Sequence, residues 1–262
     1  MFVGILAVAI GIAVLCHTAP FPFLFDAAAR KVSVWRVPEQ RAQRAVYLTF
    51  DDGPNPTVTG DLLDLLQEKK VPATFFLIDH YVTESTAPLV RRMFEEGHTV
   101  AQHTGDRRLM LRSPGRMAAE LKRSADHIER LTGFRPCPLF RPHAGWRSVP
   151  MLMGLSRAQY KLVGWSWFNW DWVWFRERTA DRVAAQILQH AAPGGIIVIH
   201  DGHHRNPRAD RRYAVGAAAM IVDRLRARGF EFSGLCATTC AEHGRNPLAL
   251  EKHWARLRVR RS

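Results

Sequence analysis

The sequence predicts an α/β fold, a distorted (β/α) barrel in which parallel strands are surrounded by outer helices. Short apolar runs alternate with amphipathic stretches in strand–helix units of roughly 20 to 35 residues, which is typical of a parallel sheet. Polar residues follow several of the apolar runs, at the strand ends where such barrels carry their chemistry. With 262 residues and 47% hydrophobic content, the chain can bury a core of this size.

The individual elements follow from apolar spacing and from residues that start or end helices. Residues 46–50 form an apolar strand ended by a Gly-Pro turn, and residues 59–69 repeat leucine at helical spacing. Residues 114–131 begin with Pro and are followed by Gly, as long helices often are. The other expected strands are 73–78, 98–102, 138–140, 162–167, 196–199 and 230–233, and the other expected helices are 87–96, 180–190 and 215–228.

We expect three parts along the chain. Residues 1–35 contain a long apolar stretch without charge, which suits a membrane anchor or a signal segment. Residues 36–240 hold the α/β domain, and residues 241–262 form a basic C-terminal tail or helix. Basic residues directly after the apolar stretch would keep the domain in the cytoplasm by the positive-inside rule, so the side of the membrane stays open.

The net charge of +13 favours an anionic partner such as lipid headgroups or an acidic wall polymer. The alternative is a solvated arginine surface with no specific partner. No helix-turn-helix, zinc-finger or RNP-like pattern occurs, so nucleic acid is not an expected partner. The sequence does not indicate an oligomeric state.

The four cysteines do not follow a Cys-x-x-Cys metal pattern. Cys236 and Cys240 are close enough in sequence to pair within a loop, which would suit an oxidising compartment. The alternative is a pair of buried thiols.

Asp, His and Arg side chains at several expected strand ends form a candidate site. Any one of them is more often structural, but their joint placement at one end of a parallel barrel favours a shared function. These residues are Asp51, Asp52, His103, Arg141, Asp171, His200 and Asp201.

In this order, the segments resemble the polysaccharide deacetylases, the NodB-homology group (carbohydrate esterase family 4-like), from about residue 46 to 232. TFDDGP at 49–54 matches the first family motif, FRPHAGW at 140–146 is similar to the Arg-Pro-Pro-Tyr-Gly motif, and IVIHD at 197–201 fits the closing motif. Asp171-Trp172 looks like the end of an Asp-x-x-Asp-Trp motif, with Phe168 in place of the first Asp. The resemblance implies a NodB-type barrel and a metal-dependent hydrolase.

One motif departs from the family pattern, in which two histidines four or five residues apart share a metal. The stretch at 103–107 is HTGDR, so Arg107 stands where the second histidine is expected, and a guanidinium cannot coordinate a metal. Asp106 is the candidate third ligand, since residues i and i+3 share a face if this segment turns helically. The alternatives are a donor from His80, His203 or His204, or no bound metal.

Chemistry and the resemblance assign the same roles. Asp52 and His103 hold a divalent cation, with donors that suit zinc, cobalt, nickel or iron. Asp51 is the general base, and His200 is the general acid that protonates the leaving amine. A second chain of contacts is expected behind them: Arg141 aims Asp51, Asp171 holds Arg141 and Asp201 tunes the pKa of His200.

The remaining candidates are groups that would contact substrate. The backbone N–H of Ala144 falls where the family has an oxyanion donor. Tryptophans alternate between 165 and 174, and an indole face stacks well on a sugar ring, although this spacing also suits a strand that packs one face inward. Trp172 and Trp146 are the expected substrate-binding residues, whereas His143 is assigned to the loop without a role.

The leading hypothesis is a hydrolase that removes N-acetyl or related acyl groups from amino sugars of a polysaccharide, cell-wall polymer or glycolipid. One alternative is a membrane-tethered carbohydrate-binding protein whose deacetylase site has decayed at Arg107. Another is an O-acetyl esterase. For all three, the expected location is membrane-anchored or exported, at the cell envelope.

Overall fold

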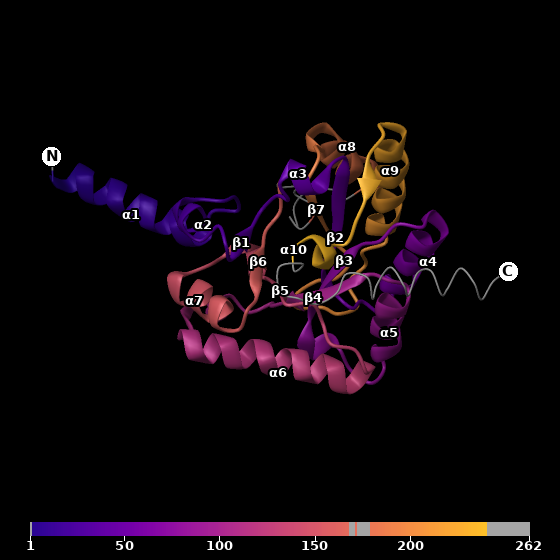
Figure 1. Cartoon of the computed structure of the whole chain (residues 1–262), viewed down its shortest axis with the longest axis horizontal. Coiled ribbons are helices and arrows are strands. Elements are labelled where there is room, and N and C mark those ends of the chain that lie inside the picture. Colours follow the sequence, from indigo (N-terminus) through magenta and orange to yellow (C-terminus); the bar gives the residue numbers. More distant parts are fainter. Residues whose placement is uncertain (1, 168–170, 172–178, 240–262) are drawn as a thin grey trace.

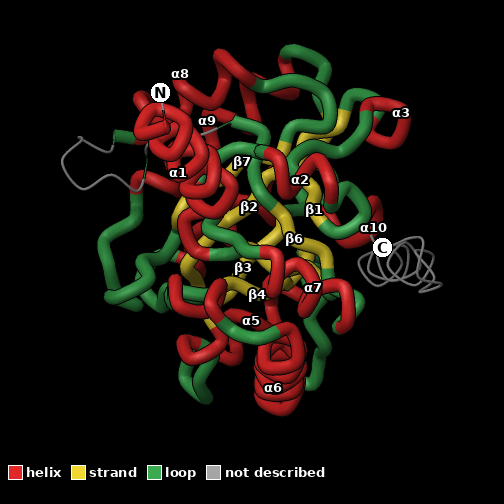
Figure 2. Tube along the Cα trace, turned by 90° about the vertical axis from the view of Figure 1, so that its left-hand side faces the viewer, coloured by secondary structure: helices red, strands yellow, loops and turns green. Residues whose placement is uncertain are grey.

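The computed structural model describes residues 2–167, 171 and 179–239. One curved sheet lies at the centre, all its paired strands run parallel, and helices surround it (Figures 1 and 2). The strand order is β1-β6-β5-β4-β3-β2-β7, and β8 pairs with β2. The predicted parallel barrel with outer helices is therefore confirmed. The strands are β1 (Ser33–Val34), β2 (Ala45–Gly53), β3 (Thr74–Ile78), β4 (Thr99–His103), β5 (Leu139–Arg141), β6 (Lys161–Val163), β7 (Ile196–His200) and β8 (Glu231–Phe232).

Among the described residues, isolated contacts and not a full ladder join the two edges of the barrel, which is therefore distorted. Arg36, just after β1, forms an antiparallel bridge with Gly195, just before β7. Ser166 N–H, beyond the end of β6, donates to Ile196 O at 3.0 Å. These contacts bring the first and last strands of the order together.

The helices form two groups on the outside of the sheet. One group packs on β2, β3 and β7, and the second packs beside β5 and β6, with α6 lying along α7 (Figure 1). The first group is α4 (Thr59–Lys69), α5 (Ala87–Glu95), α8 (Ala180–His190) and α9 (Tyr213–Ala227), and the second is α6 (Pro114–Thr132) and α7 (Val149–Arg157). The other described elements are the long helix α1 (Phe2–Thr18), the short helices α2 (Leu24–Ala28), α3 (Glu39–Ala42) and α10 (Leu235–Thr239), and the 3-10 turns η1 (Asp79–Tyr81), η2 (Arg107–Leu111) and η3 (His143–Gly145).

Most elements lie within a few residues of the sequence prediction, and α7 is the main helix that the sequence pattern missed. Pro150 and Gly154 weaken its helical signal. Packing of α7 against α6 requires the glycine at position 154, because a Cβ there would lie 2.6 Å from Met117 Cβ on α6. The expected strand at 162–167 is shorter than predicted, because β6 ends at Val163.

Helix α1 projects from the body of the protein (Figure 1) and exposes apolar side chains; Ile5, Leu6 and Val8 are 61–63% exposed. Within the described part of the chain, no helix combines the length and the apolar character that crossing a bilayer requires. The predicted division at residue 35 places β1 in the N-terminal part, although β1 pairs with β6 in the sheet. The basic tail predicted at 241–262 lies outside the described residues.

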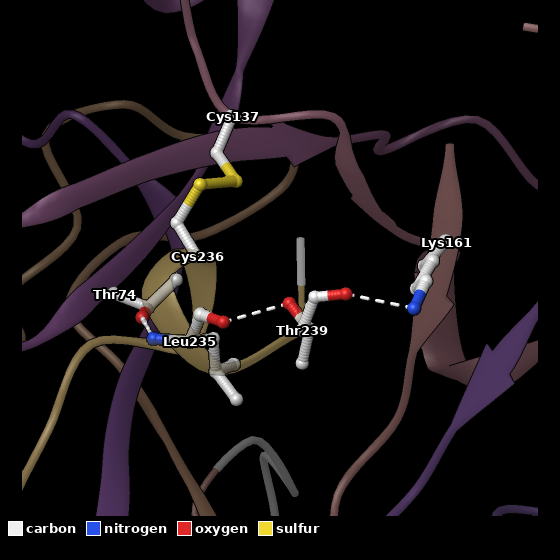
Figure 3. The surroundings of a disulfide bond; sticks show 6 residues. All are labelled: Thr74, Cys137, Lys161, Leu235, Cys236 and Thr239. Atoms are coloured by element: carbon white, nitrogen blue, oxygen red, sulfur yellow. Dashed lines mark hydrogen bonds between the residues drawn. A yellow bond between two sulfur atoms is a disulfide. The ribbon is translucent and has the colours of Figure 1, made fainter. Parts of the chain in front are cut away.

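The predicted pairing of Cys236 with Cys240 is wrong. Cys236 on α10 forms a disulfide with Cys137, which is 99 residues away in sequence (Figure 3). The reason is that α10 returns to the amino-terminal end of the barrel, where Leu235 N–H donates to Thr74 Oγ1 at 3.2 Å, at the start of β3. Cys240 lies outside the described residues, and Cys16 is a buried free thiol.

Candidate active site

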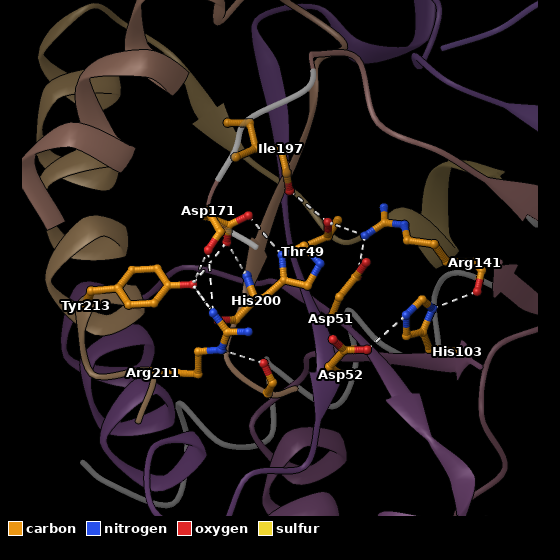
Figure 4. Close-up of polar contacts among 11 residues, drawn as sticks. Thr49, Asp51, Asp52, His103, Arg141, Asp171, Ile197, His200, Arg211 and Tyr213 are labelled. Carbon is orange, nitrogen blue, oxygen red and sulfur yellow. Dashed lines mark hydrogen bonds and ion pairs between the residues drawn. The ribbon is translucent and has the colours of Figure 1, made fainter. Parts of the chain in front are cut away.

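Strand alternation places the predicted site residues inside the barrel. On β2, Leu48 and Phe50 belong to the core beneath the helices, whereas Tyr47 belongs to the core inside the barrel. Because side chains two apart share a face, Thr49 and Asp51 continue the inner face of Tyr47. The same geometry brings side chains from four strands together at the carboxyl end of the sheet (Figure 4).

A bulge aims two adjacent carboxylates into one site. Asp51 pairs with Phe76 of β3 and Gly53 pairs with Leu77, so Asp52 is an extra residue between them. Asp52 has a left-handed backbone with φ of 68°. Without the bulge, adjacent side chains on a strand would point to opposite faces. Both carboxylates are almost fully buried, at 1% and 4% exposure.

Asp51 is held by a buried arginine, as predicted. Arg141 Nη1 lies 2.6 Å from Asp51 Oδ1 and also donates to Thr49 Oγ1 at 2.8 Å. The rest of the guanidinium donates to the carbonyl oxygens of Val163 and Gly164. Every side of Arg141 is thereby fixed, so it neutralises Asp51 and sets the direction of its carboxylate.

The prediction that Asp171 holds Arg141 is wrong, because Asp171 holds His200. Asp171 Oδ1 lies 2.9 Å from His200 Nδ1, and Asp171 Oδ2 accepts from the backbone N–H of His200 at 2.7 Å. The strand order explains the difference: β2, β3 and β4 lie between β7, which carries His200, and β5, which carries Arg141. Burial alone would lower the pKa of His200, but the Asp171 carboxylate outweighs burial and raises this pKa to about 9.

Two further residues, absent from the sequence prediction, hold Asp171 in place. The buried Arg211 lies with its Nη1 at 3.5 Å from the backbone O of Asp171, and it donates to Gly202 O and to Tyr213 Oη. Tyr213 Oη lies 3.4 Å from Asp171 Oδ2 (Figure 4). Arg211 could hardly be predicted, because it stands among many arginines and nothing in the neighbouring sequence marks it as buried.

Asp201 was expected to tune His200, but its carboxylate contacts the first motif and α4. Thr59 Oγ1 donates to Asp201 Oδ2 at 2.5 Å, and a Cβ at Gly53 would lie 3.1 Å from the same oxygen. Burial raises the pKa of Asp201 to about 7. The side chain thus supports the turn after β2, and Asp171 is the carboxylate that sets the charge of His200.

Three side chains form a group able to hold a metal ion: Asp52, His103 and His143, each with one donor atom, all within 4.8 Å of one another. His103 Nδ1 lies 2.7 Å from the carbonyl O of Arg141, so this nitrogen carries the proton and Nε2 has a free lone pair in the neutral ring. Nε2 lies 3.2 Å from Asp52 Oδ1, which is buried and has no hydrogen-bond partner among the described residues. With His103 neutral, these two acceptors face each other and suit a cation between them. Without a cation, burial alone would lower the pKa of His103, but the carboxylates of Asp52 and Asp51 outweigh burial and raise it.

His143 is the donor that sequence reasoning missed. It lies two residues beyond Arg141 in the turn η3, where Ala144 and Gly145 have positive φ values of 53° and 73°. Burial and the neighbouring His103 ring lower the pKa of His143 to about 3, so its imidazole is neutral, which is the form that binds metals. The available signal was its position directly after a strand end that already carried a site residue.

The predicted third ligand, Asp106, is not brought into this group. Its side chain is exposed and Oδ1 accepts from the backbone N–H of Arg108 at 2.8 Å, which caps η2. Arg107 is exposed as well, with its guanidinium carbon 4.9 Å from the ring centre of Trp146. Of the alternative donors, His204 packs against His143 with the two rings tilted and their centres 4.6 Å apart.

The other two alternative donors, His80 and His203, do not belong to the candidate metal group. His80 is exposed beside the ring of Tyr81, and His203 stacks on His204. Trp172, the first predicted substrate-binding residue, lies outside the described residues.

Comparisons with known proteins agree with this geometry. A family model described as polysaccharide deacetylase matches residues 39–163. A chitooligosaccharide deacetylase of Bradyrhizobium sp. (strain ANU 289) is 36% identical over 208 residues, which cover 73% of this chain and 89% of the relative. A peptidoglycan-N-acetylglucosamine deacetylase of Bacillus cereus is 30% identical over 204 residues, which cover 76% of this chain and 88% of the relative.

The fold has a solved counterpart in the Bc1960 peptidoglycan N-acetylglucosamine deacetylase, which was crystallised with a hydroxamate-type benzamide. The TM-score is 0.70 at 26% identity, over 83% of this chain and 97% of that one.

Proposed function

Since the chain belongs to the polysaccharide deacetylase family, we propose that it is a metal-dependent hydrolase that removes N-acetyl groups from amino sugars of a polysaccharide or cell-wall polymer. One observation carries this proposal. A candidate metal group, Asp52 with His103 and His143, adjoins a carboxylate fixed by arginine and a histidine fixed by aspartate. Amide hydrolysis needs these three functions in one site.

The donor set fits a divalent transition metal. One carboxylate oxygen and two neutral imidazole nitrogens suit zinc, and cobalt, nickel or iron are also compatible. When bound, such a cation lowers the pKa of water and polarises a carbonyl. His143 replaces the family histidine that Arg107 displaces, so loss of that motif position does not by itself imply loss of the metal.

Asp51 is the proposed general base. The contact with Arg141 aims its free oxygen into the site, where it accepts a proton from the attacking water. The neighbouring Asp52 does not share this role. The bulge turns its carboxylate toward His103, in the candidate metal group.

His200 is the proposed general acid. With a pKa of about 9 it carries a proton at neutral pH, and it donates that proton to the nitrogen of the leaving amine as the C–N bond breaks. An amine leaves poorly without this proton, whereas an alkoxide depends on it less. The strong hold of Asp171 on His200 therefore favours amide substrates over O-acetyl esters.

Two groups beside this centre are proposed to contact substrate. The backbone N–H of Ala144, next to His143 in η3, is the candidate donor to the developing oxyanion. The half-buried Trp146 is a candidate platform for a sugar ring, with Arg107 over its face.

We also propose that the protein works outside the cytoplasm, at the envelope. The Cys137–Cys236 disulfide suits an oxidising compartment. The apolar side chains that α1 exposes are a proposed point of attachment to the lipid surface. Co-sedimentation of the full chain with anionic lipid vesicles, compared with an Ile5→Asp and Val8→Asp double variant, tests that attachment.

The first experiment measures metal content and turnover together. The full chain should bind about one equivalent of zinc or cobalt and release acetate from an N-acetylated chitooligosaccharide. His143→Ala should weaken metal binding by at least about 100-fold, whereas the matched variant Asp106→Ala should bind as the unchanged chain does. A protein that binds carbohydrate, but does not bind metal and does not hydrolyse the amide, would favour the carbohydrate-binding alternative. Faster release from a matched O-acetyl sugar would favour the esterase.

A further inference from the structure

Residues 17–26, which we call the N-terminal strap, lie behind the loop 142–147 that carries His143 and Ala144. A buried ion pair, Asp26–Arg147, joins the strap to this loop. We propose that Asp26 and Arg147 are positioning residues for the deacetylase site: they hold the loop in the geometry that presents the third metal donor and the oxyanion donor. The inference rests on the proposed function, and it makes the strap part of the enzyme.

Arg147 connects the two segments with its whole side chain. The side chain is fully buried, and its Nε and Nη2 lie 2.8 Å and 2.6 Å from Asp26 Oδ2. Nη1 donates to Ala19 O at 2.6 Å and to Gly145 O at 2.9 Å, and Nη2 donates to Phe21 O at 2.8 Å. The planar fork of an arginine matches this set of acceptors, which the single ammonium of a lysine cannot. Gly145 is thereby tied directly to the strap.

Asp26 is fixed from its other side by the first strand. Its Oδ1 accepts from Ser33 Oγ at 2.6 Å and from Trp35 Nε1 at 2.9 Å. Its Oδ2 also accepts from the backbone N–H of Phe23 at 2.9 Å. Because Ser33 belongs to β1, these bonds fix the carboxylate relative to the sheet, and through Arg147 they fix the loop.

Backbone hydrogen bonds and ring contacts also hold the strap and the loop 142–147 close together. Arg147 N–H donates to His17 O at 2.9 Å, and Trp165 Nε1 donates to Pro20 O at 3.0 Å. A Cβ at Gly145 would lie 3.1 Å from the Trp165 ring. Ala144 has a left-handed backbone, which an alanine adopts only where neighbouring groups impose it. The contacts of Gly145 and Arg147 with the strap and with Trp165 impose it here.

The arrangement has a consequence for processing of the chain. A buried charge whose partner is removed is strongly unfavourable, so a cut directly after Asp26 that released the preceding part would leave the buried Arg147 without its partner. The same holds for a truncated protein that begins at residue 36, which lacks Asp26, Ser33 and Trp35. We therefore expect the active enzyme to retain its strap.

The test compares full-length variants. Asp26→Asn keeps the acceptor for Ser33 and Trp35 but loses the charge, and Arg147→Lys keeps the charge but loses the fork. Each should weaken zinc affinity, measured by chelator competition, by about 10- to 100-fold and lower kcat by a similar factor with little change in KM. The visible spectrum of the cobalt-loaded protein should change as well. Amide hydrogen exchange across residues 143–147 should be faster, with or without metal.

Leu225→Ala is the matched control, because Leu225 is a fully buried core residue of α9. It should lower the thermal midpoint without changing zinc affinity, the cobalt spectrum or exchange at 143–147. Folded Asp26→Asn and Arg147→Lys proteins that match the unchanged chain in zinc affinity and exchange would overturn the inference.

If both variants fail to fold, Trp35→Phe serves instead, since it removes only one donor to Asp26 and keeps an aromatic ring near Arg147. It should weaken zinc affinity by about fivefold and raise exchange in the loop, and no change in either would overturn the inference. An unchanged chain that binds no metal contradicts the proposed function, and the exchange measurement then still decides whether the strap holds the loop.

Discussion

Asp171 holds His200 through two atoms of the same residue, since its carboxylate accepts from both the imidazole Nδ1 and the backbone N–H. The ring can therefore neither turn nor shift along the strand without breaking a hydrogen bond. Nε2 is left to face the site, and the adjacent charge keeps the ring protonated. This relationship, more than the histidine alone, makes His200 suitable as an acid.

Asp171→Asn should move the alkaline limb of the pH–rate profile to lower pH. Without the carboxylate, the pKa of His200 falls from about 9 toward its ordinary value of 6.5. At pH 8 the protonated fraction, and with it kcat/KM, should drop by about 30-fold. At pH 6 the loss should be much smaller. An alkaline limb that stays in place in the variant would show that another group is the acid.

Stability of the metal-free protein should decrease in mildly alkaline solution. The folded-state pKa of His200, about 9, lies above its ordinary value of 6.5. The protonated His200 ring therefore stabilises the folded state fully below about pH 6.5, and this contribution to the free energy of unfolding is lost as pH rises through about 9. Urea unfolding at pH 6 and pH 10 measures the difference. The Asp171→Asn protein should lose less stability over the same range, and an equal loss would contradict the assignment.

Asp51→Asn should remove catalysis and spare the metal. The amide cannot accept the proton of the attacking water, so kcat should fall by about 100-fold or more. Zinc affinity should change little, because the candidate metal donors are Asp52, His103 and His143. Isothermal titration with zinc, beside acetate release, separates the two effects. Full activity in this variant would exclude Asp51 as the base.

Removing the disulfide should destabilise the domain without altering the site. Cys137 and Cys236 close a loop of 99 residues, for which chain entropy gives about 5 kcal/mol of stabilisation. Cys137→Ser should therefore lower the midpoint of denaturant unfolding, and adding a reductant to this variant should have no further effect. A reductant that leaves the midpoint of the unchanged chain in place would show that the bond does not form.

The local pattern predicted most of the barrel. The bounds of α4 and α8 agree with the predicted helices, because helical spacing and caps are properties of neighbouring residues. The strand ends were also found, and Asp51, His103, Arg141 and His200 all lie at the carboxyl ends of their strands. The third candidate metal donor, His143, was not predicted, because the altered motif at 103–107 favoured Asp106, which is near in sequence and exposed in the fold.

By itself, the sequence determined the alternation of strands and helices, the family motifs and the positions of the chemical groups along the chain. Those features depend on periods of two and 3.6 residues, which short segments carry. Only the tertiary structure decided the partners: His143 beside His103, Asp171 beside His200, and the distant pairs Cys137–Cys236 and Asp26–Arg147. Partners are set by the order of strands in the sheet and by where the loops return, and no local period records either.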